Sequence, residues 1–191
     1  MKRLAVLITG ILICSGMLAA ETVTSMKWDL GTYTGEVRNG VPHGKGIYTD
    51  EHIVAEGTFV NGEMEGYGTW IINGTDRYEG MIKKSRFNGK GKLKTPEMEY
   101  EGDFLNGKLH GKGKWRHISG DTYEGEYYLN ERHGFGRYIN AAGDIYVGQH
   151  VKGQSEGRGR QRWVNGDIYE GEWKAGLMHG QGVYQQSNGG R

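Results

Sequence analysis

The chain has 191 residues, enough for one ordinary domain, but its 35 glycines and only 2 prolines depart strongly from average usage and indicate internal repeats. Aromatic residues make up 11% of the chain and hydrophobic residues 36%, a composition that argues against disorder. The formal net charge of +1 lacks the basic excess that nucleic-acid binding needs, so we expect no nucleic-acid partner.

Residues 1–20 have the order of a secretory signal peptide, because Lys2 and Arg3 precede an uncharged, mostly apolar stretch from Leu4 to Ala20. We expect cleavage at the end of this segment. An uncleaved membrane anchor is the alternative, since a stretch of 17 residues is at the short limit for a spanning helix. The protein is therefore expected to be exported, to the periplasm, the cell envelope or the extracellular space.

The only cysteine, Cys14, lies inside this predicted signal. Removal of residues 1–20 would leave a chain with no disulfide, no thiol nucleophile and no thiolate metal site. It would also leave 22 basic against 23 acidic residues, so the mature part is predicted to be nearly neutral.

From residue 33 onward the chain recurs in seven units of 22 or 23 residues, preceded by residues 21–32 as a short N-terminal cap or linker. The units begin at residues 33, 55, 78, 100, 123, 146 and 169, with the last ending at 191. Counting the first residue of each unit as position 0, glycine occupies positions 2, 11 and 13 in all seven.

Each unit reads as a β-hairpin. In the last one, an alternating run from Tyr169 to Trp173 is followed by a turn at Ala175 and Gly176 and by a second run that ends at Tyr184. Asn-Gly pairs in the same slot of other units suit the positive φ angles of tight hairpin turns. Seven hairpins predict about fourteen strands, and the fold class is an all-β, elongated, single-layer array of antiparallel hairpins that sheet twist coils or curves.

Alternation along a strand places positions 0, 2 and 4 on one face, together with positions 11, 13 and 15 of the returning strand. This face combines aromatic residues with glycine. We expect aromatic rings of one unit to lie over glycines of the same and the next unit, so that the sheet builds a thin core without a second layer. Position 1 projects to the opposite face and is mostly acidic, as in Glu56, Glu79, Glu101, Glu124 and Glu170.

The run Tyr100–Phe104 followed by His110–Gly113 resembles the repeat of the membrane occupation and recognition nexus (MORN) family. All seven units, from 33 to 191, match its phase. The resemblance implies an elongated β-hairpin array that serves as an assembly or attachment platform, often beside membranes. The units that depart from the pattern are expected to bend or bind differently; the departures are Ala55 for the leading Tyr, Ser85 and Asn130 for the turn Gly, and Glu65, Asn88 and Glu156 for the His.

The sequence argues against three kinds of chemical site. The histidines that precede the second glycine recur in equivalent hairpin positions, roughly 9.6 Å apart in adjacent units, too far to share a metal ion whose ligands lie about 2.0–2.1 Å away. The Gly-Lys-Gly segments lack the helix N-terminus of a phosphate loop. Carboxylates are spread one per unit instead of converging. We therefore expect no catalytic, metal-binding or cofactor-binding residues, and no enzyme activity.

Six aromatic residues fall outside the repeat phase and are the predicted interface residues: Trp28, Tyr67, Phe87, Tyr128, Phe135 and Trp163. Basic clusters at Lys83, Lys84 and Arg86 and at Arg158, Arg160 and Arg162 indicate at most weak peripheral membrane contact. Residues around Trp28 could supply an incomplete cap, while the last strand is expected to leave an open edge for a partner strand.

The leading hypothesis is an exported, non-catalytic MORN-repeat scaffold that holds a protein partner, or a second copy of itself in a homodimer, at the cell envelope. Its rival is a protein that binds lipid headgroups or glycans through its aromatic face. An enzyme is the third and weakest alternative.

Overall fold

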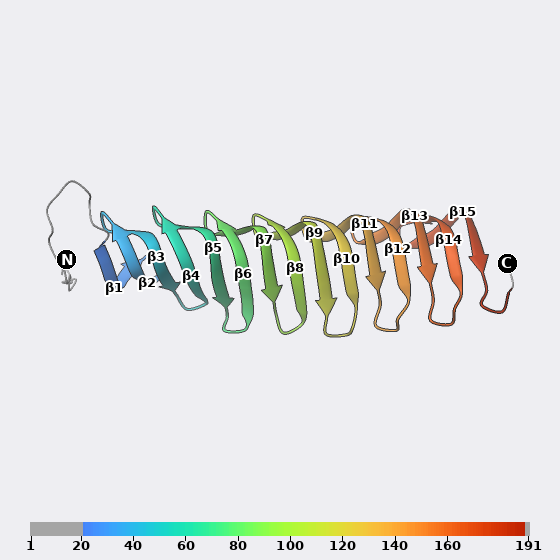
Figure 1. Ribbon diagram of the computed structural model, residues 1–191, viewed down its shortest axis with the longest axis horizontal. Helices are drawn as coiled ribbons and strands as arrows, with labels where there is room; N and C mark the ends of the chain where they lie inside the picture. The colour runs from blue at the N-terminus through green and yellow to red at the C-terminus, as the bar shows by residue number, and fades with distance from the viewer. Residues whose placement is uncertain (1–20, 190–191) are drawn as a thin grey trace. The chain divides into compact units, whose positions relative to one another are not determined.

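The computed structural model describes residues 21–189, so the predicted signal segment lies outside the described residues. The chain divides into two compact units, Met1–Arg86 and Phe87–Arg191, and the division falls within the third repeat. Figure 1 shows the strands of each unit following one another in chain order. Residues 21–189 contain no helix that is long and apolar enough to cross a membrane.

The described part of the first unit, from residue 21 onward, holds six strands that pair antiparallel with their neighbours in sequence. They are β1 (Glu21–Trp28), β2 (Gly31–Arg38), β3 (Val41–Thr49), β4 (Ile53–Val60), β5 (Glu63–Ile72) and β6 (Asp76–Lys83). Strand β1 precedes the first repeat and pairs with β2, so residues 21–189 contain fifteen strands instead of the predicted fourteen.

The second unit continues the same arrangement, with antiparallel pairing from β7 to β15. Its strands are β7 (Arg86–Lys94), β8 (Met98–Leu105), β9 (Lys108–His117), β10 (Thr122–Tyr128), β11 (Glu131–Ile139), β12 (Ile145–Val151), β13 (Gln154–Arg162), β14 (Ile168–Lys174) and β15 (Leu177–Gln185). Among residues 21–189, β14 is the only strand that pairs with β15. The predicted all-β, single-layer arrangement of antiparallel hairpins is confirmed within each unit.

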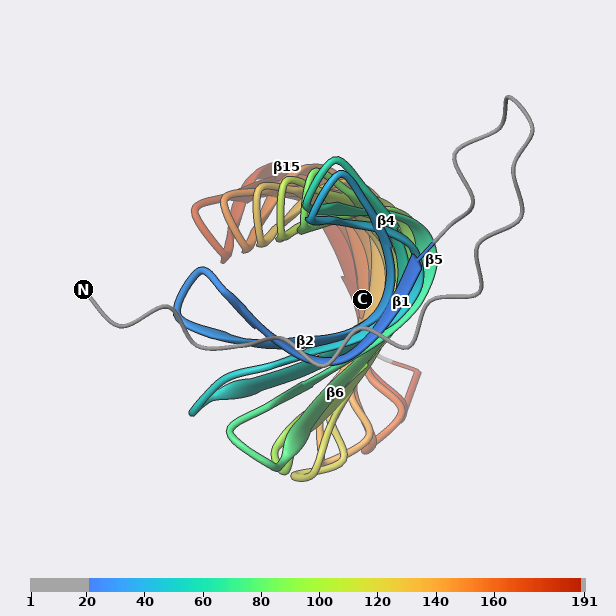
Figure 2. The ribbon, with the colours of Figure 1, turned by 90° about the vertical axis from the view of Figure 1, so that its left-hand side faces the viewer.

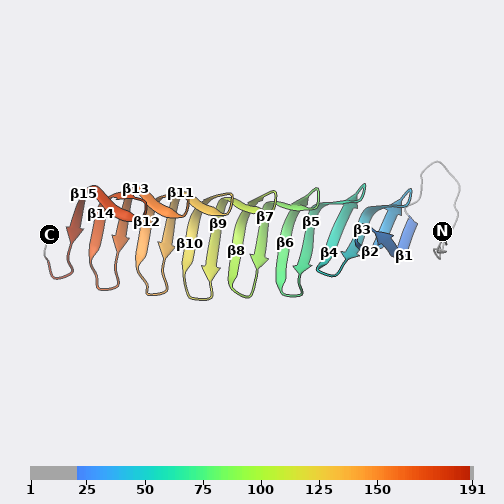
Figure 3. The same ribbon diagram turned by 180° about the vertical axis from the view of Figure 1, so that it is seen from behind.

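The strands bend, so that each unit curls across its strands instead of lying flat (Figure 2), and the turns gather along the two margins of the sheet (Figure 3). The hairpins carry a bulge at a fixed place. Pairing shifts register just after Gly35 in the first repeat and just after Gly102 in the fourth. On the returning strand the bulge contains the glycine of position 11, whose φ is 80° at Gly44 and 59° at Gly111. Glycine is required there because this left-handed conformation is costly for residues with a Cβ.

The tyrosines of position 0 form the core, at 0–7% exposure, although no second layer covers them. In the first, fourth, fifth, sixth and seventh repeats the ring lies against the two glycines paired at positions 2 and 13 of its own repeat. A Cβ added to Gly113 would come within 2.4 Å of the Tyr100 ring, and one added to Gly136 within 2.3 Å of the hydroxyl of Tyr123. The tyrosine hydroxyl also donates to the carbonyl of position 3, as Tyr100 does to Asp103 at 2.9 Å. Ring and phenol are therefore both satisfied inside one hairpin, and burial raises the pKa of Tyr33, Tyr78 and Tyr123 to about 12.

Adjacent repeats also meet ring to ring, and the indole nitrogen of Trp173 donates to the carbonyl of Gly159 in the preceding repeat at 3.2 Å. Tyr100 contacts Tyr127 of the following repeat edge-on at 5.3 Å between centroids, and Tyr146 contacts Trp173 in the same way at 5.1 Å. Edge-to-face geometry at these distances is favourable for aromatic pairs. We call this surface the ring face and the opposite surface, which bears positions 1, 3, 5, 10, 12, 14 and 16, the outer face.

The second repeat lacks the leading tyrosine, and Met64 takes over its role. A Cβ on Gly57 or Gly68 would lie 2.4 or 2.3 Å from the terminal methyl of Met64, in place of the tyrosine contact seen elsewhere. Met64 is 1% exposed, and its sulfur accepts from the indole nitrogen of Trp70 at 3.0 Å. A flexible thioether fills such a space readily. The Ala55 departure is thus compensated within the same hairpin.

The exchange can be tested by a double-mutant cycle. Ala55→Tyr alone should lower the free energy of unfolding by about 1–3 kcal/mol, because Met64 occupies the space of the new ring. Met64→Ser alone should cost about 2–5 kcal/mol through the cavity it leaves. The double variant reproduces the Tyr146 and Ser155 combination of the sixth repeat and should recover most of the loss in equilibrium denaturation. Additive losses would contradict the assignment.

Candidate binding surface

The ring face offers few free rings. The residues at positions 0 and 4 are buried, so they are occupied in holding the sheet together. Position 15 is the more accessible row, with half-buried rings at Trp70, Trp115 and Tyr138. Trp115 stacks on His117 at 5.7 Å, and the ring of Tyr138 lies 4.5 Å from the guanidinium of Arg132. A ligand on the ring face would therefore meet only this one row.

Three of the six predicted interface aromatics pack within the fold. The indole of Trp28 lies against the turn at Gly62, where a Cβ would come within 2.5 Å of it. Phe87 contacts Phe104 edge-on at 6.0 Å between centroids. Trp163 packs beside Tyr184 at 5.6 Å. These three side chains are half-buried and have intramolecular partners.

The other three are exposed on the outer face, Tyr67 at 59%, Tyr128 at 54% and Phe135 at 53%. Tyr67 belongs to the first unit, and its hydroxyl donates to Glu79. Tyr128 and Phe135 belong to the second unit, where the ring of Tyr128 lies 5.5 Å from that of His110 and 5.7 Å from that of His133. Exposed aromatic side chains of this kind are frequent anchors of interfaces.

The substituted turn and histidine positions join neighbouring repeats. The Ser85 hydroxyl and the Asn130 carbonyl oxygen accept from the amides of Met64 and Leu109 in the preceding repeat, at 2.9 and 2.8 Å. Glu65 and Glu156, which replace histidine, accept from amides in the turn of the following repeat, at 3.1 and 3.0 Å. These departures from the pattern therefore have a structural explanation.

The position-10 histidines do not converge. No group of three or more His, Cys, Asp or Glu side chains within residues 21–189 is arranged to hold a metal ion. The Nδ1 atoms of His43 and His110 are buried without a hydrogen-bond partner. They lie in separate units, so they do not make up one site.

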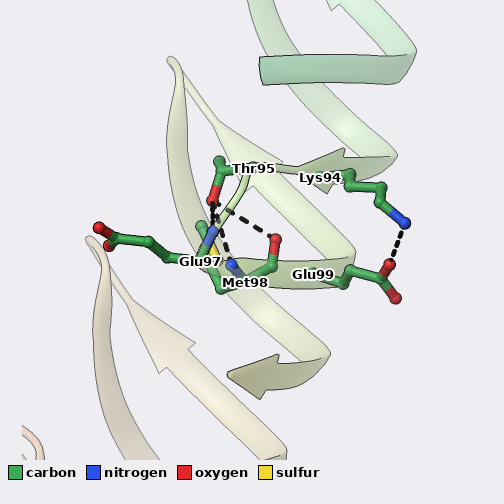
Figure 4. A network of polar contacts seen from close by, with 5 residues as sticks. All are labelled: Lys94, Thr95, Glu97, Met98 and Glu99. Atoms are coloured by element: carbon green, nitrogen blue, oxygen red, sulfur yellow. Dashed lines mark hydrogen bonds and ion pairs between the residues drawn. The ribbon is translucent and has the colours of Figure 1, made fainter. Parts of the chain in front are cut away.

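Charges alternate across the outer face of the second unit between β7 and β10. Lys90 meets Asp103 at 2.8 Å and Lys92 meets Glu101 at 3.3 Å. Figure 4 shows the next pair, Lys94 and Glu99 at 2.5 Å, beside the turn in which the Thr95 hydroxyl accepts from the amides of Glu97 and Met98. Lys114 and Glu124 continue the pattern at 3.0 Å. The lysine side chains on the second strand of these hairpins are thus neutralised by Asp and Glu side chains on the first strands beside them.

The sixth repeat interrupts this alternation. Val147 stands at position 1 and Gln149 at position 3, where the fourth, fifth and seventh repeats each carry two acidic residues. Arg137 and Arg160 both pair in register with Val147, from either side. Arg158 and Arg162 lie on the same strand as Arg160, and all four arginine side chains are exposed. No ion pair involves these four within the part of the chain that the structure describes.

The sequence predicts only part of this basic surface. The cluster of Arg158, Arg160 and Arg162 was visible in the sequence, but Arg137 lies on another strand and joins it only through the register of β11, β12 and β13. The loss of two acidic residues in one repeat was the available signal. The other predicted cluster, Lys83, Lys84 and Arg86, is exposed at the end of β6 and the start of β7.

A family model of the MORN repeat matches seven segments of the chain, at residues 33–51, 56–75, 78–96, 100–122, 123–145, 146–168 and 169–191. The chain belongs to the MORN-repeat family. The resemblance seen in the sequence is thereby confirmed. MORN repeats suggest a protein that binds or scaffolds other molecules.

Among solved structures, this MORN-repeat chain is similar to the TCP domain of SAS-4 (dCPAP) from Drosophila melanogaster, which was solved in complex with a proline-rich motif of Ana2 (dSTIL). The identity is 12% and the TM-score 0.46, over 77% of this chain and 81% of that one. A likeness at this level carries no argument about function. No curated protein matches the chain.

His150 is a polar exception in the ring face of the second unit. It is 2% exposed and lies edge-on to Tyr123 and Tyr146, 5.1 Å from each centroid. Burial, aided by the charge of Arg132, lowers the pKa of His150 from 6.5 to about 4. The folded state therefore requires the neutral imidazole.

Stability should fall as the pH drops from about 6.5 toward 4, because the unfolded chain then binds a proton that the folded chain excludes. The loss is at most about 3 kcal/mol over this window. The second and fourth repeats have phenylalanine, Phe59 and Phe104, at the repeat position of His150. The variant His150→Phe should therefore be tolerated and should flatten the pH dependence of the denaturation midpoint. His52→Phe, at an exposed turn, should leave the slope unchanged. An unaltered slope in His150→Phe would contradict the assignment.

Proposed function

We propose that this MORN-repeat chain is an exported, non-catalytic scaffold that holds a protein partner at the cell envelope, through the outer face of its sheet. The proposal rests on one observation, that the ring face packs its aromatic side chains within the fold while the outer face exposes aromatic side chains to solvent. Rings of the repeat motif are consumed by packing on the ring face, whereas Tyr67, Tyr128 and Phe135 are exposed on the outer face. Aromatic rings exposed in water gain most from burial against a partner.

Export rests on the order of charge and apolar residues in segment 1–20. Mass spectrometry of the protein recovered from its host distinguishes a cleaved signal from an uncleaved anchor. An intact amino terminus in a cytoplasmic fraction would overturn this part of the proposal.

The partner surface can be tested by placing a photo-crosslinking amino acid at Tyr67, Tyr128 or Phe135 of the full chain in its own host. Discrete protein adducts are expected from these positions. A matched control at Ile118, 74% exposed in the turn that follows β9, should give few or none. An adduct of twice the mass of the uncrosslinked chain recovered from the same cells would identify the partner as a second copy.

Absence of protein adducts from all three positions would contradict the scaffold proposal. Binding of the full chain to liposomes or to a glycan array, lost on substitution of Trp70 or Trp115, would instead support the ring-face alternative.

A further inference from the structure

The interrupted charge pattern in the sixth repeat creates an unusual surface on the second unit. An open groove of about 1010 Å³ lies on the outer face there, lined by Phe135, Val147, Arg158, Arg160, Ile168 and Glu170 among others. Its basic residues come from the strand β13, and its apolar residues from β11, β12 and β14. The groove therefore combines guanidinium groups with an apolar floor.

The guanidinium groups are available to an external ligand. In the fourth and fifth repeats the acidic residue of position 1 faces the basic strands beside it, as Glu124 does for Lys114. Val147 in the sixth repeat cannot do so. The Glu172 carboxylate, which pairs in register with Arg158, lies against the bulge at Gly180 on β15. Arg160 and Arg137 also pair in register with Glu170 and Glu124 on their other sides, yet none of the four arginines forms an ion pair within residues 21–189.

The spacing of the arginines selects the form of the ligand. Arg158, Arg160 and Arg162 alternate along β13, so their side chains project from one face at intervals of roughly 6.6–6.8 Å. An extended peptide has the same interval between every second side chain. Planar guanidinium groups bind carboxylates through two parallel hydrogen bonds. Three carboxylates at alternate residues of an extended segment would thus each lie opposite one of the three arginines.

We propose that the outer face of β11–β14 binds an extended acidic peptide segment with Asp or Glu at every second residue. This inference rests on the proposed function and deepens it by naming the chemistry of the partner. Its acidic side chains pair with Arg158, Arg160 and Arg162, and Arg137 adds a fourth contact from β11. Its intervening residues cover Phe135, Val147 and Ile168. Glu170 within the groove and the near-neutral charge of the mature chain disfavour a long polyanion or an anionic bilayer as the ligand.

The probe is a fluorescent nonapeptide of alternating Glu and Val, and binding to the full chain is measured by fluorescence anisotropy at low salt. A peptide of the same composition with its glutamates contiguous is the control for spacing. The alternating peptide should bind about tenfold more tightly, and added salt should weaken its binding. Equal affinity for the two peptides would overturn the match of spacing.

Variants locate the site. Arg160→Gln should weaken binding of the alternating peptide about tenfold, because it removes one charge-assisted contact. Arg116→Gln, an exposed arginine of β9, is the matched control and should change little. Val147→Glu restores the acidic residue found at this position in five other repeats, beginning with Glu56, and should abolish binding while leaving the circular dichroism spectrum intact.

Two outcomes would overturn the inference. One is undiminished peptide binding by Val147→Glu. The other is capture of the full chain by phosphatidylserine vesicles with no peptide binding, which would identify an anionic surface as the ligand. Either result leaves the scaffold proposal standing if the outer-face positions still give protein adducts, so the two proposals fail separately.

Discussion

The contact between the tyrosine of position 0 and the glycine pair of its own hairpin is the interaction on which the rest of the structure depends. A single-layer sheet has no second layer to bury its apolar side chains, so it must bury them against itself. Removing two Cβ atoms opposite each other creates the room, and the bulge that follows bends the strands over it. The phenol then bonds to the backbone at that bulge, as in Tyr33 with Glu36 at 2.8 Å. Ring contacts between successive repeats extend this local solution along each unit.

The same constraint shapes what the protein has left for binding. Because the ring face is used for packing, amino-acid substitutions that preserve the fold are easiest on the outer face. The alternating charged side chains there are exposed, and each contributes little to stability. Loss of two acidic residues in the sixth repeat therefore changes the surface without touching the core. His150 shows the contrasting case, because burial of an imidazole inside the ring face lowers its pKa, and we expect stability to depend on pH as a result.

The repeat phase, the hairpins and the aromatic and glycine face could be predicted from the sequence because they follow from spacing alone. Strand β1 could not, since residues 21–28 carry no copy of the repeat. The replacement of the missing tyrosine by Met64 could not be predicted either, because the repeat spacing does not show which side chain fills the space over Gly57 and Gly68. Likewise, Arg137 joins Arg160 only through register across Val147. Half-burial of Trp28, Phe87 and Trp163 was also beyond reach, because phase indicates a face but not the neighbours that cover it.

The fold depends on the contact between tyrosine rings and paired glycines in the first, fourth, fifth, sixth and seventh repeats. Nuclear Overhauser effects in the folded chain measure this contact directly. Strong effects are predicted between the ring protons of Tyr100 and the α-protons of Gly113, and likewise between Tyr123 and Gly136, because a Cβ at either glycine would lie within 2.5 Å of the ring. Turn glycines such as Gly107, which have nothing near them, should show none. Absence of the effects at Gly113 and Gly136 in a folded sample would contradict the account.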